Sequence, residues 1–378
     1  AVTAGQSTWT RAEQAALAQA IFDSLFRLGR LQPLVDDDRV ENIIILGHDR
    51  VWLELVDGTL IPGPAVADSD EELIEFISFL ASREGSARSF SEAHPSLDLR
   101  LADGSRLSAT NWVTSTPSIV IRRHRLVDVT LDDLVRLGTL TPVMATFLRA
   151  AVKAELSIVV AGAQGAGKTT LLRALCNEIN PLEQLATFED PHELFLDELR
   201  DRHAVVHAFE ARHGSGEMAL PVSQRKNVAR QIVGEVRGPE AWLMIKAMES
   251  GSGSLSTTHA ASAADAMDKL VTCCMEAGRH VSSELAARKL GRAIDLVVHI
   301  RLDNTTDVDG TKHRRRVVSE IVAVGQGEVD LGYALTTVFS PVPNAPASPT
   351  LLPDHLRMLA RHGFDIDTFH AQATGARR

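Results

Sequence analysis

Cysteines are rare in this sequence, and their positions exclude two kinds of scaffold. Cys176, Cys273 and Cys274 are too few for a disulfide framework. None of them stands in a Cys-x-x-Cys pair or at the spacing of zinc ligands. We therefore exclude a disulfide-stapled fold and a cysteine-based zinc module, and we expect a reducing compartment.

Long apolar runs and an excess of positive charge are also absent. No stretch of the sequence reaches the roughly 18 consecutive apolar residues of a membrane-spanning helix. Residues 1–9 contain no basic segment followed by an apolar run. The chain as printed, which begins with Ala1 rather than Met, is therefore expected to be cytoplasmic. Its formal net charge of -10 disfavours direct nucleic-acid binding, which depends on a cationic surface.

The chain is long enough for two hydrophobic cores, with 378 residues of which 44% are hydrophobic. In residues 1–125, helical periodicity and short β-like runs follow one another, and we interpret this region as a smaller α+β N-terminal domain. The expected elements are helices over 10–31 and 71–82 and strands over 40–46, 51–55, 60–61, 97–101, 106–112 and 118–122.

Strands and helices alternate in residues 126–342, which is typical of a parallel sheet covered by helices. Helices are expected over 132–137 and 142–153, ahead of an apolar strand over 156–161. The pattern predicts an α/β fold for this second domain.

A phosphate-binding loop is the strongest motif of the chain. Residues 162–169 match Gly-x-x-x-x-Gly-Lys-[Ser/Thr] and stand between the apolar strand and a helical segment over 171–179. The backbone N–H groups of such a loop and the positive end of the next helix bind phosphate oxygens. Lys168 is expected to reach the β- and γ-phosphates of ATP, and the Thr169 hydroxyl to ligate Mg²⁺. The expected nucleotide contacts are Gly162, Ala163, Gln164, Gly165, Ala166, Gly167, Lys168, Thr169 and Thr170.

Two acidic segments follow predicted strands. Glu235 comes after the apolar run 231–233, at the carboxyl end of a strand, where open α/β sheets bind ligands. Glu189 opens an acidic run, 189–193, after the strand-like run 185–188. A glutamate in such a position is often a solvated strand end. Beside a P-loop, we expect Glu235 to hold Mg²⁺ through water and the 189–193 run to orient the attacking water.

Four segments together resemble the type II/type IV secretion ATPase superfamily. They occur in the order and approximate spacing of that family over about residues 15–340, and the nearest branch resembles the CpaF/TadA ATPases of Tad-type pilus systems. The lack of the tetracysteine zinc module that many general-secretion ATPases carry also favours that branch. The segments are the P-loop at 162–169, an acidic box at 187–194, a Walker-B-like segment at 232–238 and a histidine box at 253–260.

The resemblance implies a RecA-like fold for 126–342 and roles for individual residues. Glu189 corresponds to the catalytic acid, Glu235 to the Mg²⁺-associated acid and His259 to the histidine-box residue near the γ-phosphate. Arg237, in the Walker-B-like segment, is also expected to be catalytic. On chemistry alone, a lone histidine at a Thr-rich strand end is more often packed or solvated, and the four segments together favour the catalytic role.

The resemblance also implies partners and further phosphate contacts. Family members form homohexameric rings at the cytoplasmic face of the inner membrane, docked to a polytopic platform protein, and their N-terminal domain caps the nucleotide between subunits. Arginines of that domain, of its linker and of the region near the acidic box bind nucleotide phosphates, a task that suits the guanidinium fork. A solvated basic linker is the alternative for each arginine. The matching positions are Arg106, Arg122, Arg123 and Arg212.

One segment departs from the family pattern. Between Gly216 and Arg225 the chain is about one helical turn, roughly four residues, shorter than in the family. A helix that normally presents an arginine is therefore expected to be clipped or replaced there, which would weaken activity.

Two segments near the end of the chain carry further patterns. Residues 344–349 are rich in Pro, Ala and Ser and predict a tether within a peripheral tail, 343–378, that carries a helix near 353–361. The run 307–310 resembles a calcium loop, but Arg316 stands where a bidentate Glu is required. We interpret that run as a hairpin turn instead, between strands over 296–302 and 316–324.

These features predict a ring-shaped ATPase motor that powers Tad/type IV-like pilus assembly or type II/IV protein secretion. Two alternatives remain open. One is a conjugation or effector-export ATPase of the type IV secretion branch. The other is a regulatory nucleotide-binding module with negligible turnover, which the shortened segment before Arg225 supports. A small-molecule kinase is disfavoured, because nothing suggests an acceptor site.

Overall fold

The computed structural model describes residues 9–83, 89–101, 103–123, 128–189, 192–210, 226, 228–249, 253–306, 312–327 and 332–375. The chain divides into two compact units, each built around its own sheet. Unit 1 comprises residues 1–125 and 305–314, and unit 2 comprises residues 126–304 and 315–378. Within the described ranges, no helix is long and apolar enough to cross a membrane.

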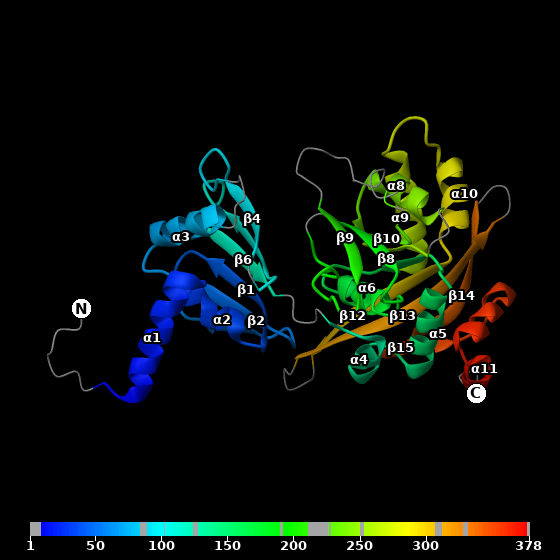
Figure 1. The fold of residues 1–378 in the computed structure, drawn as a ribbon, viewed down its shortest axis with the longest axis horizontal. Helices are drawn as coiled ribbons and strands as arrows, with labels where there is room; N and C mark the ends of the chain where they lie inside the picture. Colours follow the sequence, from blue (N-terminus) through cyan, green and yellow to red (C-terminus); the bar gives the residue numbers. More distant parts are fainter. Residues whose placement is uncertain are drawn as a thin grey trace. The chain divides into compact units, whose positions relative to one another are not determined.

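Unit 1 is an antiparallel sheet with helices packed on it (Figure 1). The strand order β3-β2-β1-β6-β5-β4 places Ile43 of β1 opposite Ile121 of β6. Both are buried in one apolar cluster with Leu73 and Ile77 of α3, because alternate residues of a strand face the same side of the sheet. The elements are α1 (Arg11–Phe26), η1 (Gly29–Leu31), α2 (Gln32–Asp36), β1 (Val40–Leu46), β2 (Val51–Leu55), β3 (Leu60–Gly63), α3 (Asp70–Arg83), β4 (Ser96–Arg100), β5 (Arg106–Thr110) and β6 (Ser118–Arg122).

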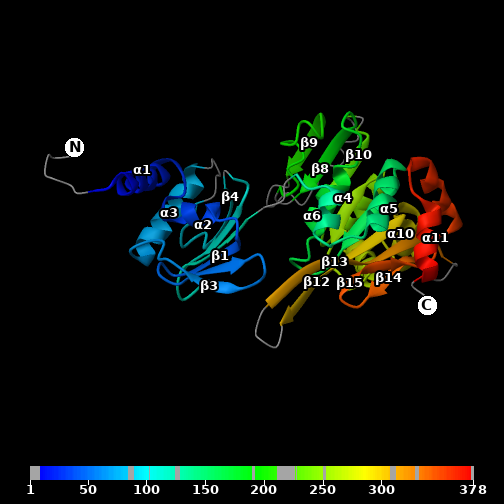
Figure 2. The ribbon, with the colours of Figure 1, turned by 90° about the horizontal axis from the view of Figure 1, so that it is seen from below.

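Unit 2 contains a nine-stranded sheet with the order β15-β14-β13-β12-β7-β11-β10-β8-β9. The strands from β12 to β9 pair in parallel, and Figure 2 shows β9, β8 and β10 side by side. The α/β fold expected for the second domain is thereby confirmed. The strands are β7 (Ile158–Ala161), β8 (Gln184–Glu189), β9 (Val205–Glu210), β10 (Arg230–Val236), β11 (Leu255–Thr258), β12 (Leu296–Thr306), β13 (Lys312–Gln326), β14 (Tyr333–Val342) and β15 (Ala345–Pro349).

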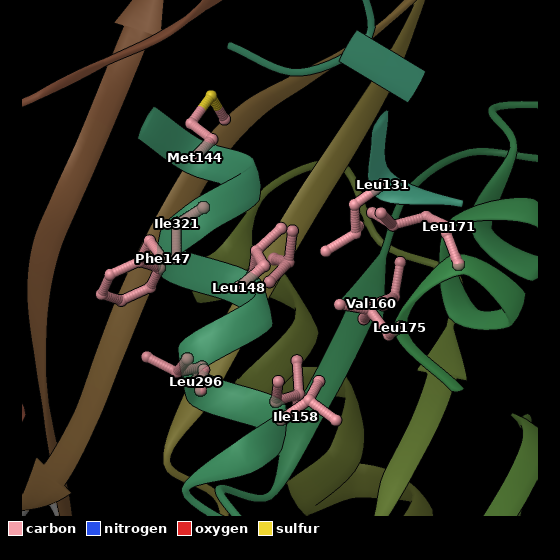
Figure 3. Close-up of a cluster of buried hydrophobic side chains, with 14 of the residues drawn as sticks. Leu131, Met144, Phe147, Leu148, Ile158, Val160, Leu171, Leu175, Leu296 and Ile321 are labelled. Atoms are coloured by element: carbon pink, nitrogen blue, oxygen red, sulfur yellow. The ribbon is translucent and has the colours of Figure 1, made fainter. Parts of the chain in front are cut away.

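Helices cover both faces of the unit 2 sheet, so its central strand β7 is buried throughout. Ile158 and Val160 face the cluster built with α4, α5 and α6, which Figure 3 shows. Val159 and Ala161 face the opposite cluster, built with α8, α9 and α10. The helices are α4 (Leu131–Arg136), α5 (Pro142–Lys153), α6 (Lys168–Cys176), α8 (Glu240–Met248), α9 (Ala263–Met275), α10 (Ser283–Ala293), η2 (Asp354–His362) and α11 (Ile366–Gly375).

The segment expected to be a tether is part of the sheet of unit 2. Residues 345–349 form β15, which pairs antiparallel with β14. The prediction of a tether was wrong. It relied on the prolines, but β15 is an edge strand, and an edge strand tolerates residues without an N–H donor. The following helices are anchored as well, since the ring of Phe369 on α11 lies 5.4 Å from that of Phe339 on β14.

Strands β12 and β13 are longer than the 296–302 and 316–324 expected. Arg314 of β13 belongs to unit 1, where its guanidinium lies 2.8 Å from the Glu54 carboxylate and 3.2 Å from that of Glu41. The turn predicted at 307–310, the site of the calcium-loop resemblance, lies outside the described residues.

The three cysteines are free and buried. Burial raises the pKa of the Cys274 thiol to about 12, which disfavours the reactive thiolate.

Candidate nucleotide site

Three glycines give the loop after β7 its shape. Gly165 and Gly167 have φ angles of +73° and +96°, a left-handed conformation that L side chains rarely adopt. A Cβ atom on Gly162 would lie 2.3 Å from the carbonyl oxygen of Ile300 on β12. The loop thus leads from a fully buried strand to the N-terminus of the nine-residue helix α6, where backbone N–H groups favour anions.

Lys168 is buried and lies between its own loop and the histidine box. Its ammonium donates to the carbonyl of Ala163 at 3.1 Å and lies 3.2 Å from Nδ1 of His259. An ammonium only donates, so Nδ1 must be the accepting nitrogen and the ring proton resides on Nε2. Nε2 lies 2.6 Å from Oε1 of Glu235. Burial, and next the charge of Lys168, lower the pKa of His259, which favours this neutral ring.

Glu235 stands at the carboxyl end of β10, where two threonines of β11 fix the backbone on either side of it. The hydroxyl of Thr257 donates to the carbonyl of Gly234 at 2.7 Å. The hydroxyl of Thr258 donates to the carbonyl of Val236 at 3.0 Å. The Glu235 carboxylate also pairs with Arg237, so two of the predicted catalytic residues are in direct contact.

The acidic box contacts the loop through Glu193, whereas Glu189 bonds within the box. Oε2 of Glu189 accepts the backbone N–H groups of Glu193 and Leu194 at 2.6 and 2.8 Å. Its other oxygen lies 3.4 Å from Nδ1 of His192, and this contact raises the pKa of His192. The carboxylate that touches the loop is that of Glu193, which accepts from the Thr169 hydroxyl at 2.9 Å.

A buried arginine supports Glu193. Arg173 of α6 donates to the backbone carbonyl of Glu193, and its guanidinium carbon lies 5.1 Å from the ring centre of Phe195. No sequence motif indicates this contact, because the two residues belong to different segments. Arg316 of β13, which also contacts the loop, carries no motif signal either.

The structure therefore brings together most of the predicted site of unit 2. One chain of contacts runs from Lys168 through His259 to Glu235, and another runs from Thr169 through Glu193 to Glu189. The two chains meet at neighbouring strands β8 and β10, because a Cβ atom on Gly234 would lie 3.0 Å from Cγ of Glu189.

Three of the predicted arginines, Arg106, Arg122 and Arg123, belong to unit 1. There, Arg106 stands opposite Arg122 in the β5–β6 pair. Arg123 donates to the carbonyl of Val40 at 3.0 Å and is thereby engaged in its own unit. Arg212, together with the shortened segment before Arg225, lies outside the described residues.

Comparison with known proteins identifies the family of this chain and proteins of similar fold. The family model described as "Type II/IV secretion system protein" matches residues 84–326. The type IV secretion system protein VirB11 of Brucella suis is 29% identical over 311 residues, which cover 73% of this chain and 84% of that protein. The type IV secretion system protein PtlH of Bordetella pertussis is 38% identical over 185 residues, which cover 46% of this chain and 51% of that protein. The ATPase DotB of Legionella pneumophila is similar in structure, with a TM-score of 0.55 at 19% identity, over 80% of this chain and 81% of that one.

Proposed function

Because the chain belongs to the type II/IV secretion system protein family, we propose that it hydrolyses ATP at the P-loop of unit 2 to drive a secretion or pilus-assembly machine. The observation that carries the proposal is the contact of both functional P-loop side chains with acid-bearing segments. Lys168 reaches Glu235 through His259, and Thr169 reaches Glu189 through Glu193. A glycine-rich turn with a purely structural role would not need these four segments together at the ends of neighbouring strands.

The donor atoms at the loop suit magnesium as well as phosphate. The hydroxyl of Thr169 and the carboxylate of Glu193 lie 2.9 Å apart, and Mg²⁺ binds oxygen donors such as these together with water. A bound ion would offset the negative charge of the phosphate oxygens. Thr169 and Glu193 are the residues that would hold the ion, and Glu235 would act on it through water.

The protein groups divide the remaining tasks of hydrolysis. Lys168 binds the β- and γ-phosphate oxygens with its ammonium once it leaves the carbonyl of Ala163. Glu189, a carboxylate at the end of β8, orients or deprotonates the attacking water. The neutral His259 lies between Lys168 and Glu235 and keeps the two side chains in place. Arg237 holds the other oxygen of Glu235.

A lysine substitution tests the catalytic site. Lys168→Ala is expected to lower steady-state phosphate release at least about 100-fold, the usual loss when one charge-stabilising donor is removed. Lys153→Ala, at the exposed end of α5, serves as the control and should turn over normally. Unchanged turnover in a folded Lys168→Ala protein would exclude this loop as the catalytic site. Absent turnover in the assembled wild type would instead support the regulatory nucleotide-binding module.

We propose more specifically that the chain belongs to the CpaF/TadA branch and drives Tad-type pilus assembly. The absence of a tetracysteine module supports this branch. A second candidate, a type IV secretion or conjugation ATPase, is favoured by the similarity to VirB11 over 73% of the chain. Deleting the gene separates them: loss of surface pili supports the first, and loss of conjugation or effector export with intact pili supports the second.

We further propose a homohexamer, located at the cytoplasmic face of the inner membrane and docked to a polytopic platform protein, without direct nucleic-acid contact. Arg106, Arg122, Arg123 and Arg212 are then phosphate-binding residues that act within or between subunits. The mass of the assembly, measured with and without a non-hydrolysable ATP analogue, tests the ring. A monomer in both conditions would contradict it.

A further inference from the structure

Arg316 of β13 lies across the phosphate-binding loop. Its Nε donates to the carbonyl of Gly165 at 3.0 Å, between residues 151 positions apart in the sequence. Its Cδ lies 3.3 Å from the place that a Cβ atom on Gly167 would occupy. The side chain thus packs on both of the left-handed glycines that shape the loop.

The strand order explains how a residue so distant in sequence reaches the loop. β13 follows β12, and β12 pairs with β7, whose carboxyl end carries the loop. Ile300 of β12 packs under the loop, with its carbonyl oxygen close to Gly162. The loop therefore lies between β11 with the histidine box and the pair β12–β13 with Arg316.

Arg316 belongs to a line of hydrogen bonds that crosses the loop and ends at the catalytic lysine. In a trans peptide the carbonyl and the following N–H point in opposite directions. The carbonyl of Gly165 accepts from Arg316, and the N–H of Ala166 donates to the carbonyl of Ala163 at 3.3 Å. That same carbonyl accepts from Lys168. The orientation of one peptide thus connects the guanidinium to Lys168.

We propose that Arg316 is a positioning residue for the triphosphate, an inference that rests on the proposed function. It fixes the Gly165–Ala166 peptide, so that the loop is ordered before ATP arrives, and it places a second permanent positive charge beside the phosphates. Both effects strengthen ATP binding, because a preorganised site loses less entropy on binding and guanidinium groups attract phosphate oxygens.

The neighbouring arginine provides a matched control. Arg315 carries the same charge one position earlier on the same strand, but successive side chains of a strand point to opposite faces. Its guanidinium donates to the carbonyl of Asn344 at 3.1 Å, and the residue is exposed.

Binding of a fluorescent ATP analogue and the kinetics of phosphate release test the proposal together. We expect Arg316→Ala to raise the Kd of the analogue and the KM for ATP by roughly 10- to 100-fold, the effect of losing a hydrogen bond to a charged group, with a smaller change in kcat. Arg316→Lys should recover part of the loss because it keeps the charge, and Arg315→Ala should match the wild type in both measurements.

Two results would overturn the proposal. One is a Kd for Arg316→Ala within twofold of that for Arg315→Ala. The other is a loss of kcat and melting temperature without a change in Kd, which would show a purely structural role. The binding measurement distinguishes failure of this proposal from failure of the proposed function. A wild type that binds the analogue but does not hydrolyse ATP would refute the ATPase activity, and the role of Arg316 could still be tested by Kd.

Discussion

Replacing Gly162 by alanine tests how tightly β12 supports the phosphate-binding loop. The added Cβ would lie 2.3 Å from the carbonyl oxygen of Ile300, and real Cβ atoms keep at least about 3.0 Å from such an atom. The obstacle is backbone rather than a flexible side chain. It belongs to a strand held in register with β7, with His299 opposite Ala161. The loop or the strand must therefore shift by several tenths of an ångström.

The size of the effect follows from that shift. Forcing an extra methyl group into a packed interior costs about 1–3 kcal/mol, which lowers the melting temperature of a domain of this size by several degrees. Catalysis is more sensitive, because a misplacement of about 1 Å can reduce a rate by about 100-fold. We therefore expect Gly162→Ala to remain folded at room temperature and to lose about one to two orders of magnitude in kcat/KM.

A second glycine of the same unit supplies the control. Gly325 of β13 has no atom within 4 Å of the position of an added Cβ and no positive φ. Gly325→Ala is therefore expected to match the wild type in both phosphate release and thermal melting. The reasoning is refuted if Gly162→Ala is folded and within twofold of the wild type in kcat/KM.

Three other outcomes are expected. Glu193→Gln removes the carboxylate that accepts from Thr169, so a magnesium titration should show half-maximal turnover at about tenfold higher Mg²⁺, and an unshifted curve contradicts this. Burial and then Lys168 lower the pKa of His259, while an unfolded histidine titrates near pH 6.5. The neutral ring therefore contributes fully to the free energy of unfolding above about pH 6.5, and this contribution is lost as the pH falls toward the lower native pKa. Melting temperature and turnover should decline in that window, and an identical acid decline in His259→Asn would refute the assignment. His299→Ala removes a buried ring that bonds Ser319 at 2.7 Å and the backbone of Ala260 at the end of the histidine box, so kcat should fall several-fold with little change in the KM for ATP.

Local motifs predicted the parts of this site whose geometry is set within one segment. The strand, the loop and the helix around Lys168 follow from glycine placement and apolar patterning over consecutive residues, and so they could be predicted from the sequence. Likewise Glu235 ends a strand whose apolar run is evident. The site residues of unit 1 were predicted from the resemblance alone, and no contact within that unit tests them.

The parts that escaped prediction depend on turns and on strand order. Glu189 and Glu193 belong to one acidic box, and only the path of the chain after β8 decides which of them reaches Thr169. Arg316 reaches the loop because β13 lies beside β12, a neighbour relation that no short pattern encodes. The prolines at 346 and 349 indicated a tether because their position at the edge of the sheet is a property of the whole fold.

The two functional P-loop side chains bond to other groups of the protein, and this affects how ATP binds. A buried ammonium without acceptors would be costly, and Lys168 avoids that cost through Ala163 and His259. Thr169 is similarly bonded to Glu193. ATP must exchange these bonds for its own, so its affinity reflects the difference between two bonded states rather than the sum of new contacts. Arg316 contacts the carbonyl of Gly165 instead, and that contact can persist while Lys168 and Thr169 change partners. For this reason its removal should appear mainly in the affinity for ATP, whereas changes at His259 or Glu235 should appear mainly in turnover.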